Sequence, residues 1–490
     1  MSEQIPKRLF YAGVFIVWFC TMSVLVFKHY HPLNSTHETA SPVVLPEELL
    51  GEQWMGVYFK GNKIGHSTRK FEKKGSGYRV SETLDVDMKI MEVPKKIGTV
   101  MEVLLSSDLS LMSFKADLKG DAGITVLGDV HGRDLRVTIV TEGGRMTRVI
   151  PLKERPSLSL SLVPNILKDG LTPGRRFSIP VIDPASLSQE IVPIEVAGKE
   201  EIAISGKIKE AYRLKGSSKS TDFSIWVTAK GEVLKEESPM GFTLIREEKE
   251  EALRKGTAPS DLWEVAAVPF NKKLPADVHY LKIGVSGVDL DDFEMEGGRQ
   301  LRRGNIVEIR KEDLDAPSIR RRPGGKNKEA RLSSEYLQDT PFVQSKDSQI
   351  TALARKIVGS EKDRLTASRR ICNWVYENVE KTPALTIPMA AEVLKTKKGD
   401  CNEHTTLFTA LARASGIPAR MALGLVYKDG AFYYHAWPEI FSRDWVAVDP
   451  TLGQFPADAA HIRIITGDID QQLKLTKVIG KIKIEGIEYR

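Results

Sequence analysis

The stretch GDCNEHTTLFTALARASG, residues 399–416, decides the fold because a cysteine opens a run whose apolar residues recur at helical spacing. Asp400 is a residue type that favours the helix N-cap, and Gly416 is typical of the position that ends a helix. We therefore predict that Cys401 lies in the first helical turn. Unpaired backbone N–H groups and the positive end of the helix dipole there favour a thiolate and can hold an oxyanion.

Three segments with strand-like sequence follow this helix, at residues 419–427, 432–441 and 445–449. The first two are joined across Lys428-Asp429-Gly430, and an Asp-Gly pair between apolar runs is a strong signal for a hairpin turn. This pattern predicts an antiparallel sheet directly after the cysteine helix.

His435 lies on the second of these segments and Asp449 closes the third. Residues directly opposite one another in an antiparallel pair share a face, and a hairpin loop of odd length makes these two residues share one. A five-residue loop, 440–444, would pair them directly. The carboxylate could then accept a hydrogen bond from one imidazole nitrogen while the other nitrogen faces Cys401.

The runs GDCNEHTTLFTALARASGIPARMALGLVY, YHAW and WVAVDPT resemble the transglutaminase-like superfamily, whose cysteine-dependent fold is related to papain. The resemblance, to a bacterial membrane-anchored type, covers roughly residues 336–467. It implies that Cys401 is the nucleophile, His435 the general base and then acid, and Asp449 the orienting carboxylate. Papain-like enzymes use an upstream glutamine as an oxyanion donor, but Lys395 stands upstream here. We assign the backbone N–H of Cys401 and leave the second donor open.

Three further residues are candidates for substrate contacts, and each also has a structural interpretation. His404 lies on the same helical face as Cys401, Trp437 shares a strand face with His435, and Gln454 follows in a loop. An aromatic residue on a half-buried strand is more often part of the core. His461 follows Asp449 in the chain and could also line the site.

A metal site is a possible alternative use of the same residues. Cys401 and His404 form a Cys-x-x-His pair that His435 and Asp449 could complete. A zinc ion would consume the thiolate that the helix terminus prepares, so we predict no metal and no cofactor.

The composition describes ordinary globular protein, with 41% hydrophobic and 28% charged residues over 490 positions, enough for two or three domains. The net charge is only +6, and no stretch interleaves aromatic and basic residues, so we predict no nucleic-acid partner. The cysteines are Cys20, Cys372 and Cys401, too few for a disulfide framework. We predict that Cys372 is a core residue.

The N-terminal region predicts a membrane anchor. Residues 1–8 form a short tail with two basic residues, and residues 9–27 are apolar throughout, long enough to span a bilayer core. A buried core helix and a cleavable signal peptide are the alternatives; residues 28–47, which we read as a linker, offer no small-x-small cleavage site close behind the apolar run. The basic tail predicts an N-in orientation with the catalytic domain outside the cytoplasmic membrane.

The remaining chain predicts an α+β fold in which a mainly antiparallel β domain precedes the papain-like domain. Residues 48–253 alternate polar and apolar positions between glycine turns, as antiparallel hairpins do. A small β segment at 270–309 and a charged linker at 310–335 follow. The transglutaminase-like domain then occupies 336–470, with two amphipathic helices ahead of the cysteine helix, and 471–490 forms a C-terminal strand or extension.

These features predict a membrane-anchored enzyme that attacks an amide carbonyl and forms a thioester acyl-enzyme. Water as the acceptor would make it a peptidase or amidase, and an amine would make it a transglutaminase. The predicted partner is a protein or peptide substrate: envelope protein, secreted peptide or cell-wall stem peptide. The alternative is a binding or scaffold module that keeps the fold without catalysis.

Overall fold

The structure is a computed structural model. It describes residues 42–490 apart from 91–92, 121–122, 142–143, 185–186, 188, 219–221, 239–240, 257–266, 316–334, 384–387, 468–470, 472–473 and 476–477. The predicted anchor at 9–27 and most of the predicted charged linker lie outside the described residues. Among the helices of the described part, none is long and apolar enough to cross a membrane.

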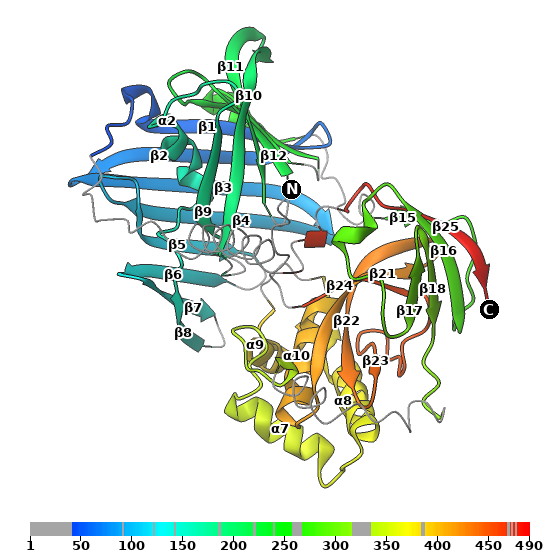
Figure 1. Cartoon of the computed structure of the whole chain (residues 1–490). Coiled ribbons are helices and arrows are strands. Elements are labelled where there is room, and N and C mark those ends of the chain that lie inside the picture. The colour runs from blue at the N-terminus through cyan, green and yellow to red at the C-terminus, as the bar shows by residue number, and fades with distance from the viewer. Residues whose placement is uncertain are drawn as a thin grey trace, which may run out of the picture. The chain divides into compact units, whose positions relative to one another are not determined.

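Fourteen strands in the first half of the described chain form one antiparallel sheet (Figure 1). Their order in the sheet is β8-β7-β6-β5-β4-β3-β2-β1-β14-β13-β12-β11-β10-β9. The strands are β1 Gly51–Phe59, β2 Asn62–Lys74, β3 Gly77–Ile90, β4 Val93–Leu105, β5 Leu111–Lys119, β6 Ile124–His131, β7 Asp134–Thr141, β8 Gly144–Pro151, β9 Arg176–Ile182, β10 Gln189–Ile204, β11 Lys207–Ser217, β12 Asp222–Val227, β13 Val233–Glu237 and β14 Phe242–Arg246.

Sequence-adjacent strands pair almost throughout this sheet, as short glycine turns between alternating runs require. The exception is the central pair, where β14 returns to lie beside β1 and joins the two halves. A short helix, α2 Leu162–Leu167, contributes to the apolar core on the β9–β12 half. The antiparallel β domain is therefore confirmed, and its described strands belong to one sheet.

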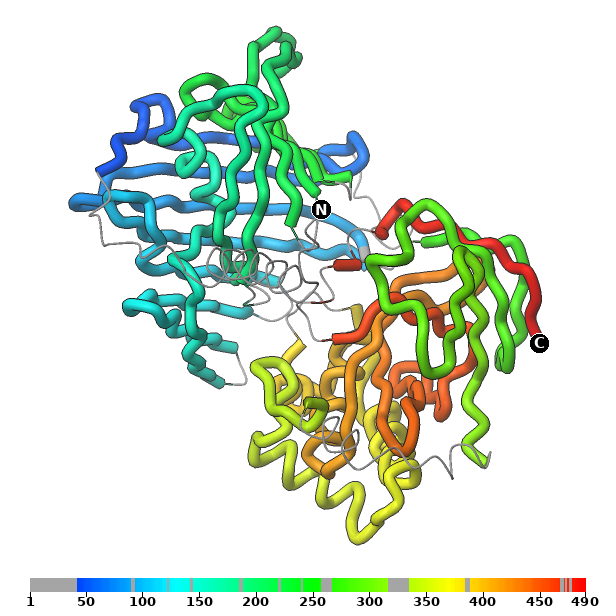
Figure 2. The backbone as a smooth tube through the Cα atoms, in the orientation of Figure 1, coloured from blue at the N-terminus to red at the C-terminus, as the bar shows by residue number. Residues whose placement is uncertain are grey.

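The described C-terminal half contains two larger sheets and a parallel pair of two-residue strands, β19 Glu380–Lys381 and β20 Lys398–Gly399 (Figure 2). The two larger sheets are as follows. The first has the order β15-β22-β21-β24, with β23 paired to β22, and the second has the order β17-β18-β16-β25. Their strands are β15 Val268–Pro269, β16 Tyr280–Ser286, β17 Gln300–Arg303, β18 Ile306–Arg310, β21 Ala419–Lys428, β22 Ala431–Phe441, β23 Trp445–Ala447, β24 His461–Thr466 and β25 Lys483–Tyr489. One apolar core joins these two sheets and contains Ile283, Val307, Leu425 and Ile462.

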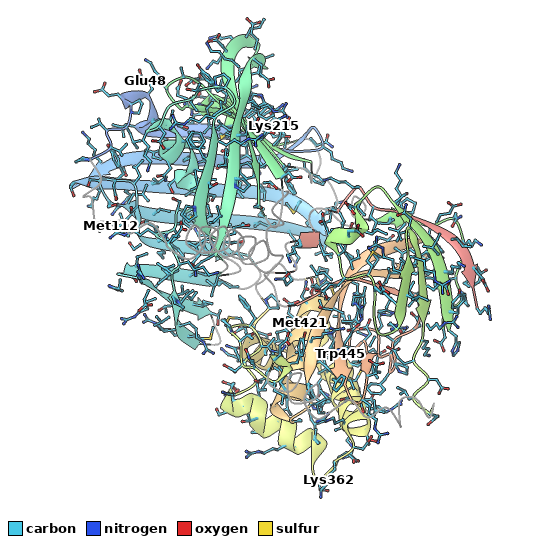
Figure 3. The ribbon with its side chains drawn as sticks, in the orientation of Figure 1. Glu48, Met112, Lys215, Lys362, Met421 and Trp445 are labelled. Atoms are coloured by element: carbon cyan, nitrogen blue, oxygen red, sulfur yellow. The ribbon has the colours of Figure 1, made fainter. Side chains whose placement is uncertain are left out.

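Four helices pack on the strands β21 and β22 through a second core that includes Ile350, Ile371, Leu407 and Ile440. They are α7 Ser348–Val358, α8 Arg364–Asn378, α9 Ala390–Thr396 and α10 Cys401–Ala414. Figure 3 labels Met421 and Trp445 among the strands of this half, and Lys362 in the loop between α7 and α8. The four helices cover one part of the sheet that contains β21 and β22, and the sheet β17-β18-β16-β25 packs on another part of it. This combination gives the C-terminal half its α+β character.

Candidate active site

Helix α10 begins at Cys401, and its first turn is closed by a capping box. The Asp400 side chain accepts from the Asn402 N–H, and the Glu403 carboxylate accepts from the Asp400 N–H at 2.8 Å. At the other end Gly416 has a φ of +75° and Ile417 donates to the Ala412 carbonyl, as in a Schellman motif. The predicted placement of the thiol at the helix N-terminus is therefore confirmed.

The environment of the Cys401 sulfur differs from the predicted one. Burial raises the pKa of the thiol, and the nearby Asp400, Glu403 and Asp449 carboxylates raise it further, although the Ala436 backbone N–H donates to the sulfur and opposes them. A thiolate was expected because unpaired N–H groups and the positive end of the helix dipole lie at this position. The acidic capping box works against that dipole and favours the protonated thiol.

Strand β22 carries His435 and pairs with β21 through a two-residue turn. Asp429 and Gly430 both have positive φ, 48° and 94°, which identifies the type I′ geometry that an Asp-Gly pair favours. Gly424 lies opposite His435, and a Cβ there would come within 1.9 Å of the Ile462 carbonyl oxygen. A glycine is required because β24 approaches β21 so closely at this position.

The hairpin between β22 and β23 is tighter than predicted. Phe441 pairs with Trp445, so the loop has three residues, 442–444, and the predicted five-residue loop is wrong. A loop of three residues also has odd length, so His435 and Asp449 still lie on the same face of the sheet. Continuing this register, Asp449 falls opposite Trp437 and meets His435 on the diagonal.

The His435 imidazole and the Asp449 carboxylate are hydrogen-bonded. Nε2 of His435 lies 2.8 Å from Oδ2 of Asp449, and because an ionised carboxylate only accepts, the imidazole donates. Oδ1 accepts from the backbone N–H groups of Thr451 and Leu452, at 2.7 and 2.9 Å. Burial alone would raise the pKa of Asp449, but His435 and His461 outweigh it and hold that pKa far below its usual value.

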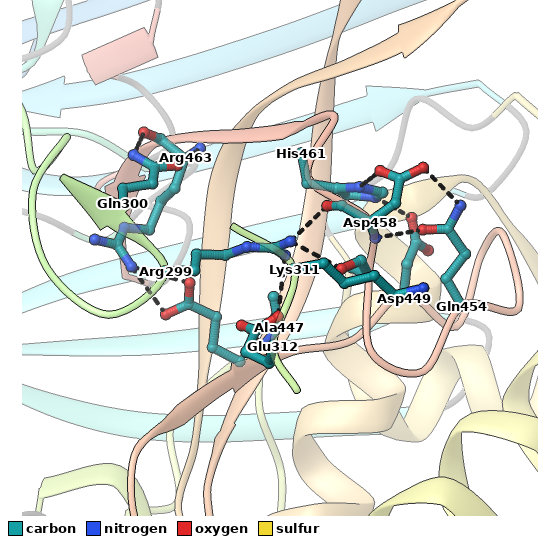
Figure 4. A network of polar contacts seen from close by, with 12 residues as sticks. Arg299, Gln300, Lys311, Glu312, Ala447, Asp449, Gln454, Asp458, His461 and Arg463 are labelled. Carbon is teal, nitrogen blue, oxygen red and sulfur yellow. Dashed lines mark hydrogen bonds and ion pairs between the residues drawn. The ribbon is translucent and has the colours of Figure 1, made fainter. Parts of the chain in front are cut away.

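His461, a candidate to line the site, contacts Asp449 and Asp458, and the sequence did not predict these contacts. It begins β24 and is fully buried, and its Nε2 lies 3.0 Å from the same Oδ2 of Asp449. Its Nδ1 lies 2.9 Å from Oδ1 of Asp458 (Figure 4). Only its position shortly after Asp449 in the chain pointed to it, because the β21–β24 pairing that brings it in is long-range.

Two of the three residues predicted to contact substrate, His404 and Trp437, are fully buried, and their contact with substrate stays a prediction. His404 has both ring nitrogens against backbone carbonyls, Nδ1 at 2.7 Å from Asp400 and Nε2 at 3.2 Å from Val379. Trp437 stacks behind His435, with ring centroids 6.2 Å apart. In this structure the His404 ring is therefore held by backbone carbonyls, and the Trp437 ring packs against His435.

Gln454, the third, is half-buried and braces the loop that carries Asp449. Its backbone exchanges two hydrogen bonds with Asp449, each of 2.9 Å. Its side chain accepts from the Asp458 N–H and donates to the Asp458 carboxylate at 3.3 Å. These contacts occupy the amide, and substrate contact by Gln454 stays a prediction.

Cys372 on α8 lies beneath the same loop and is fully buried. Burial, with a smaller effect from Asp449, raises the pKa of its thiol to about 12. The sulfur points to the Gln454 carbonyl at 3.9 Å. Cys372 is therefore a core residue, as predicted, and an unreactive internal control for Cys401.

In the described residues, His435, Asp449 and His461 have donor atoms close enough together to raise the question of a metal ion. Both imidazole nitrogens lie at hydrogen-bond distance from one carboxylate oxygen, 2.8 and 3.0 Å. Ligand atoms around a tetrahedral zinc ion are about 3.3 Å apart, given bonds of about 2.0 Å. We therefore describe the three as a hydrogen-bonded set, and the absence of a metal cofactor stays a prediction.

The sequence of this region matches a known family. Residues 351–450 match the transglutaminase-like superfamily. An uncharacterized protein of Haemophilus influenzae is 33% identical over 112 residues, which are 20% of this chain and 30% of that protein. The uncharacterized protein YebA of Bacillus subtilis is 26% identical over 148 residues, 25% of this chain and 20% of that protein. The match thus spans less than a third of either relative.

A solved structure of a candidate cysteine protease from Cytophaga hutchinsonii also resembles this chain. It is 17% identical, and the alignment covers 44% of this chain and 86% of that one with a TM-score of 0.28.

Proposed function

We propose that this chain, whose residues 351–450 form a transglutaminase-like domain, is a cysteine-dependent enzyme that cleaves amide bonds through a thioester acyl-enzyme. The observation that carries the proposal is the His435–Asp449 hydrogen bond beside a thiol at a helix N-terminus. Cys401 on α10 packs against the core that contains Ala436, the residue that directly follows His435 in β22, so the nucleophile lies against the strand that carries the base.

The first half of the reaction forms the acyl-enzyme. Because Nε2 of His435 donates to Asp449, Nδ1 is the nitrogen left to take the Cys401 thiol proton as the sulfur attacks the amide carbon. The carbonyl oxygen gains the negative charge, and the N–H of Cys401, which has no acceptor within its own helix, is our candidate donor to it. The carbon–nitrogen bond then breaks, and the amine leaves with the proton held by His435.

The second half resolves the thioester. Water or an amine attacks the thioester carbon, gives its proton to His435, and displaces the Cys401 sulfur, which recovers the proton as a thiol. Asp449 stabilises the imidazolium in both halves. Water gives a peptidase or amidase, and an amine gives a transglutaminase; access to the acyl-enzyme decides between them.

The setting of this activity is also part of the proposal. The apolar run at 9–27 and the basic tail before it support an anchor in the cytoplasmic membrane, N-in, with the catalytic domain outside. An enzyme in that place meets protein or peptide substrates of the cell envelope.

The test compares Cys401→Ala with Cys372→Ala in the full chain. Peptide release and amine incorporation would be followed with dimethylcasein and envelope peptide extracts as amide donors. Both activities should vanish in Cys401→Ala and persist in Cys372→Ala. If Cys401→Ala kept its fold, measured by circular dichroism, and also kept wild-type turnover, Cys401 would not be the nucleophile and the proposal would be wrong. A folded wild-type chain with neither activity would favour the binding module.

A further inference from the structure

His461 lies between two carboxylates, and the reaction outlined above gives this imidazole no role. It is fully buried, with Nε2 3.0 Å from Asp449 and Nδ1 2.9 Å from Asp458. The Trp437 ring lies edge-on to it, with centroids 5.2 Å apart, and the His435 ring is 5.9 Å away. The charged groups that face this imidazole are therefore Asp449, Asp458 and, when it carries a proton, His435.

The hydrogen bonds around these carboxylates show where the proton resides. A neutral imidazole has one N–H, yet each ring nitrogen of His461 faces a carboxylate oxygen. Asp449 receives further donors at both oxygens, and Asp458 receives the Ala460 N–H and the Gln454 amide. Every described contact of both carboxylates is with a donor. Two ionised carboxylates with an imidazolium between them satisfy all of these contacts.

The electrostatic balance agrees with this geometry. Burial lowers the pKa of His461, but the hydrogen bonds and charges of Asp449 and Asp458 outweigh it, so that pKa lies above its usual value. Burial likewise opposes ionisation of Asp458, whose pKa His461 nevertheless holds low. Two carboxylates and one imidazolium leave a single negative charge, which His435 neutralises when it takes the thiol proton.

We propose that His461 is a positioning residue of the active site: as a buried imidazolium it keeps Asp449 ionised and aimed at Nε2 of His435. This inference rests on the proposed function. Without the imidazolium, Asp449 and Asp458 would face each other as two like charges in a buried place, and one would take up a proton. A protonated Asp449 could no longer stabilise the His435 imidazolium.

Two residues next to β17 and β18 stabilise the loop that carries Asp449 and Asp458 (Figure 4). Nη2 of Arg299, just before β17, donates to the carbonyl oxygens of Ala457 and Asp458 at 2.8 and 2.6 Å. Glu312, just after β18, accepts from the Ala447 N–H at 3.0 Å. The residues that flank the β17–β18 hairpin, Arg299 and Glu312, therefore hydrogen-bond to both ends of the loop that carries Asp449.

The test is the protonation state of His461 in the full chain, read by nuclear magnetic resonance of ¹⁵N-labelled histidine rings between pH 5 and 9. We expect His461 to keep both ring protons at pH 7, where an ordinary imidazole has mostly lost one. His404 is the internal comparison: both of its ring nitrogens also face oxygens, but these belong to uncharged backbone carbonyls, so burial lowers its pKa and its ring should be neutral. A neutral His461 at pH 7 would overturn the proposal.

Asp458→Asn separates charge from shape. The asparagine keeps the size and an acceptor oxygen but removes one carboxylate, so His461 should lose its second proton at a pH lower by about one unit or more. An unchanged titration would contradict the charge argument. The ring ¹⁵N signal whose titration shifts in Asp458→Asn is assigned to His461. This assignment does not require a folded His461→Gln variant.

Activity gives the second readout and separates this inference from the proposed function. His461→Gln should lower turnover about tenfold to a hundredfold, less than loss of the base, which costs about 10²–10⁴-fold. It should also shift the pH profile, which lost packing alone would not do. Turnover and a pH profile equal to wild type would overturn the positioning role, while loss of activity in Cys401→Ala would leave the proposed function standing.

Discussion

Nε2 of His435 and Oδ2 of Asp449 are 2.8 Å apart although the two residues are not direct partners in the β22–β23 hairpin. The three-residue loop places Asp449 opposite Trp437, one diagonal step from His435. The contact therefore depends on the loop beyond β23, where Thr451 and Leu452 hold the other carboxylate oxygen.

Asp449→Asn should cost far more activity than the size of the change suggests. The N–H groups of Thr451 and Leu452 keep the amide oxygen at Oδ1, so the amide NH₂ faces His435 and His461 as donor against donor. His435 would then adopt the tautomer whose proton faces the thiol. We expect turnover to fall on the order of 10³–10⁴-fold, measured by steady-state kinetics on variant protein that thermal unfolding shows to be folded. A loss under tenfold would show that Asp449 does not set the tautomer.

The raised pKa of Cys401 predicts its pH-dependent alkylation. Since burial and three carboxylates favour the protonated thiol, the thiolate fraction should keep increasing above pH 8.5, where an ordinary cysteine is half ionised. The iodoacetamide rate, followed by mass spectrometry from pH 6 to 10, should therefore still rise at pH 9. Cys372 should stay unlabelled in the native chain. A rate that levels off below pH 7 would instead indicate a preformed thiolate–imidazolium pair.

Glu439 should be among the most stabilising polar residues of the C-terminal half. It is 1% exposed and binds Arg463 at 3.0 Å and Arg420 at 2.6 Å; burial would raise its pKa, but both arginines outweigh this and lower it. Glu439→Gln leaves two guanidinium groups without a counter-charge. We expect a loss of about 3–5 kcal/mol in the free energy of unfolding by urea.

Glu380→Gln is the matched control for this change. Glu380 pairs with Lys398 at 3.1 Å, but both side chains are more than half exposed. Exposed pairs contribute about 0–1 kcal/mol, so this variant should unfold like wild type. Similar losses in the two variants would contradict the assigned role of burial.

The proposed anchor predicts the side of the membrane on which the folded part lies. Protease added to intact spheroplasts should digest residues 48–490, because the basic tail keeps the N-terminus inside. A protected fragment of full size, degraded only after lysis, would show the opposite orientation.

The local features of the site were predictable because neighbouring residues encode them. The N-cap at Asp400, the C-terminal Gly416 and the Asp429-Gly430 turn each depend on a few adjacent positions, and all were found as expected. The thiol environment was not predicted correctly, since the acidic capping box that fixes the helix also raises the pKa of Cys401.

Long-range pairings account for what the sequence did not reveal. His461 enters the site through the β21–β24 ladder, and Arg299 reaches the Asp449 loop from far upstream in the chain. In the β domain, alternation predicted antiparallel strands, but nothing local indicates that β14 returns to β1. Pairing across such distances depends on the folded core and leaves no periodic signal.

The central claim is the acyl-enzyme, and its direct measurement is the mass of the protein after brief reaction. The full chain would be mixed with an envelope peptide extract, quenched in acid within seconds, and mapped by mass spectrometry. An acyl adduct on Cys401 that hydroxylamine removes, absent from Cys401→Ala and present in Cys372→Ala, is the predicted result. Amide turnover by the wild type with no adduct on Cys401, and equal turnover by Cys401→Ala, would contradict the account.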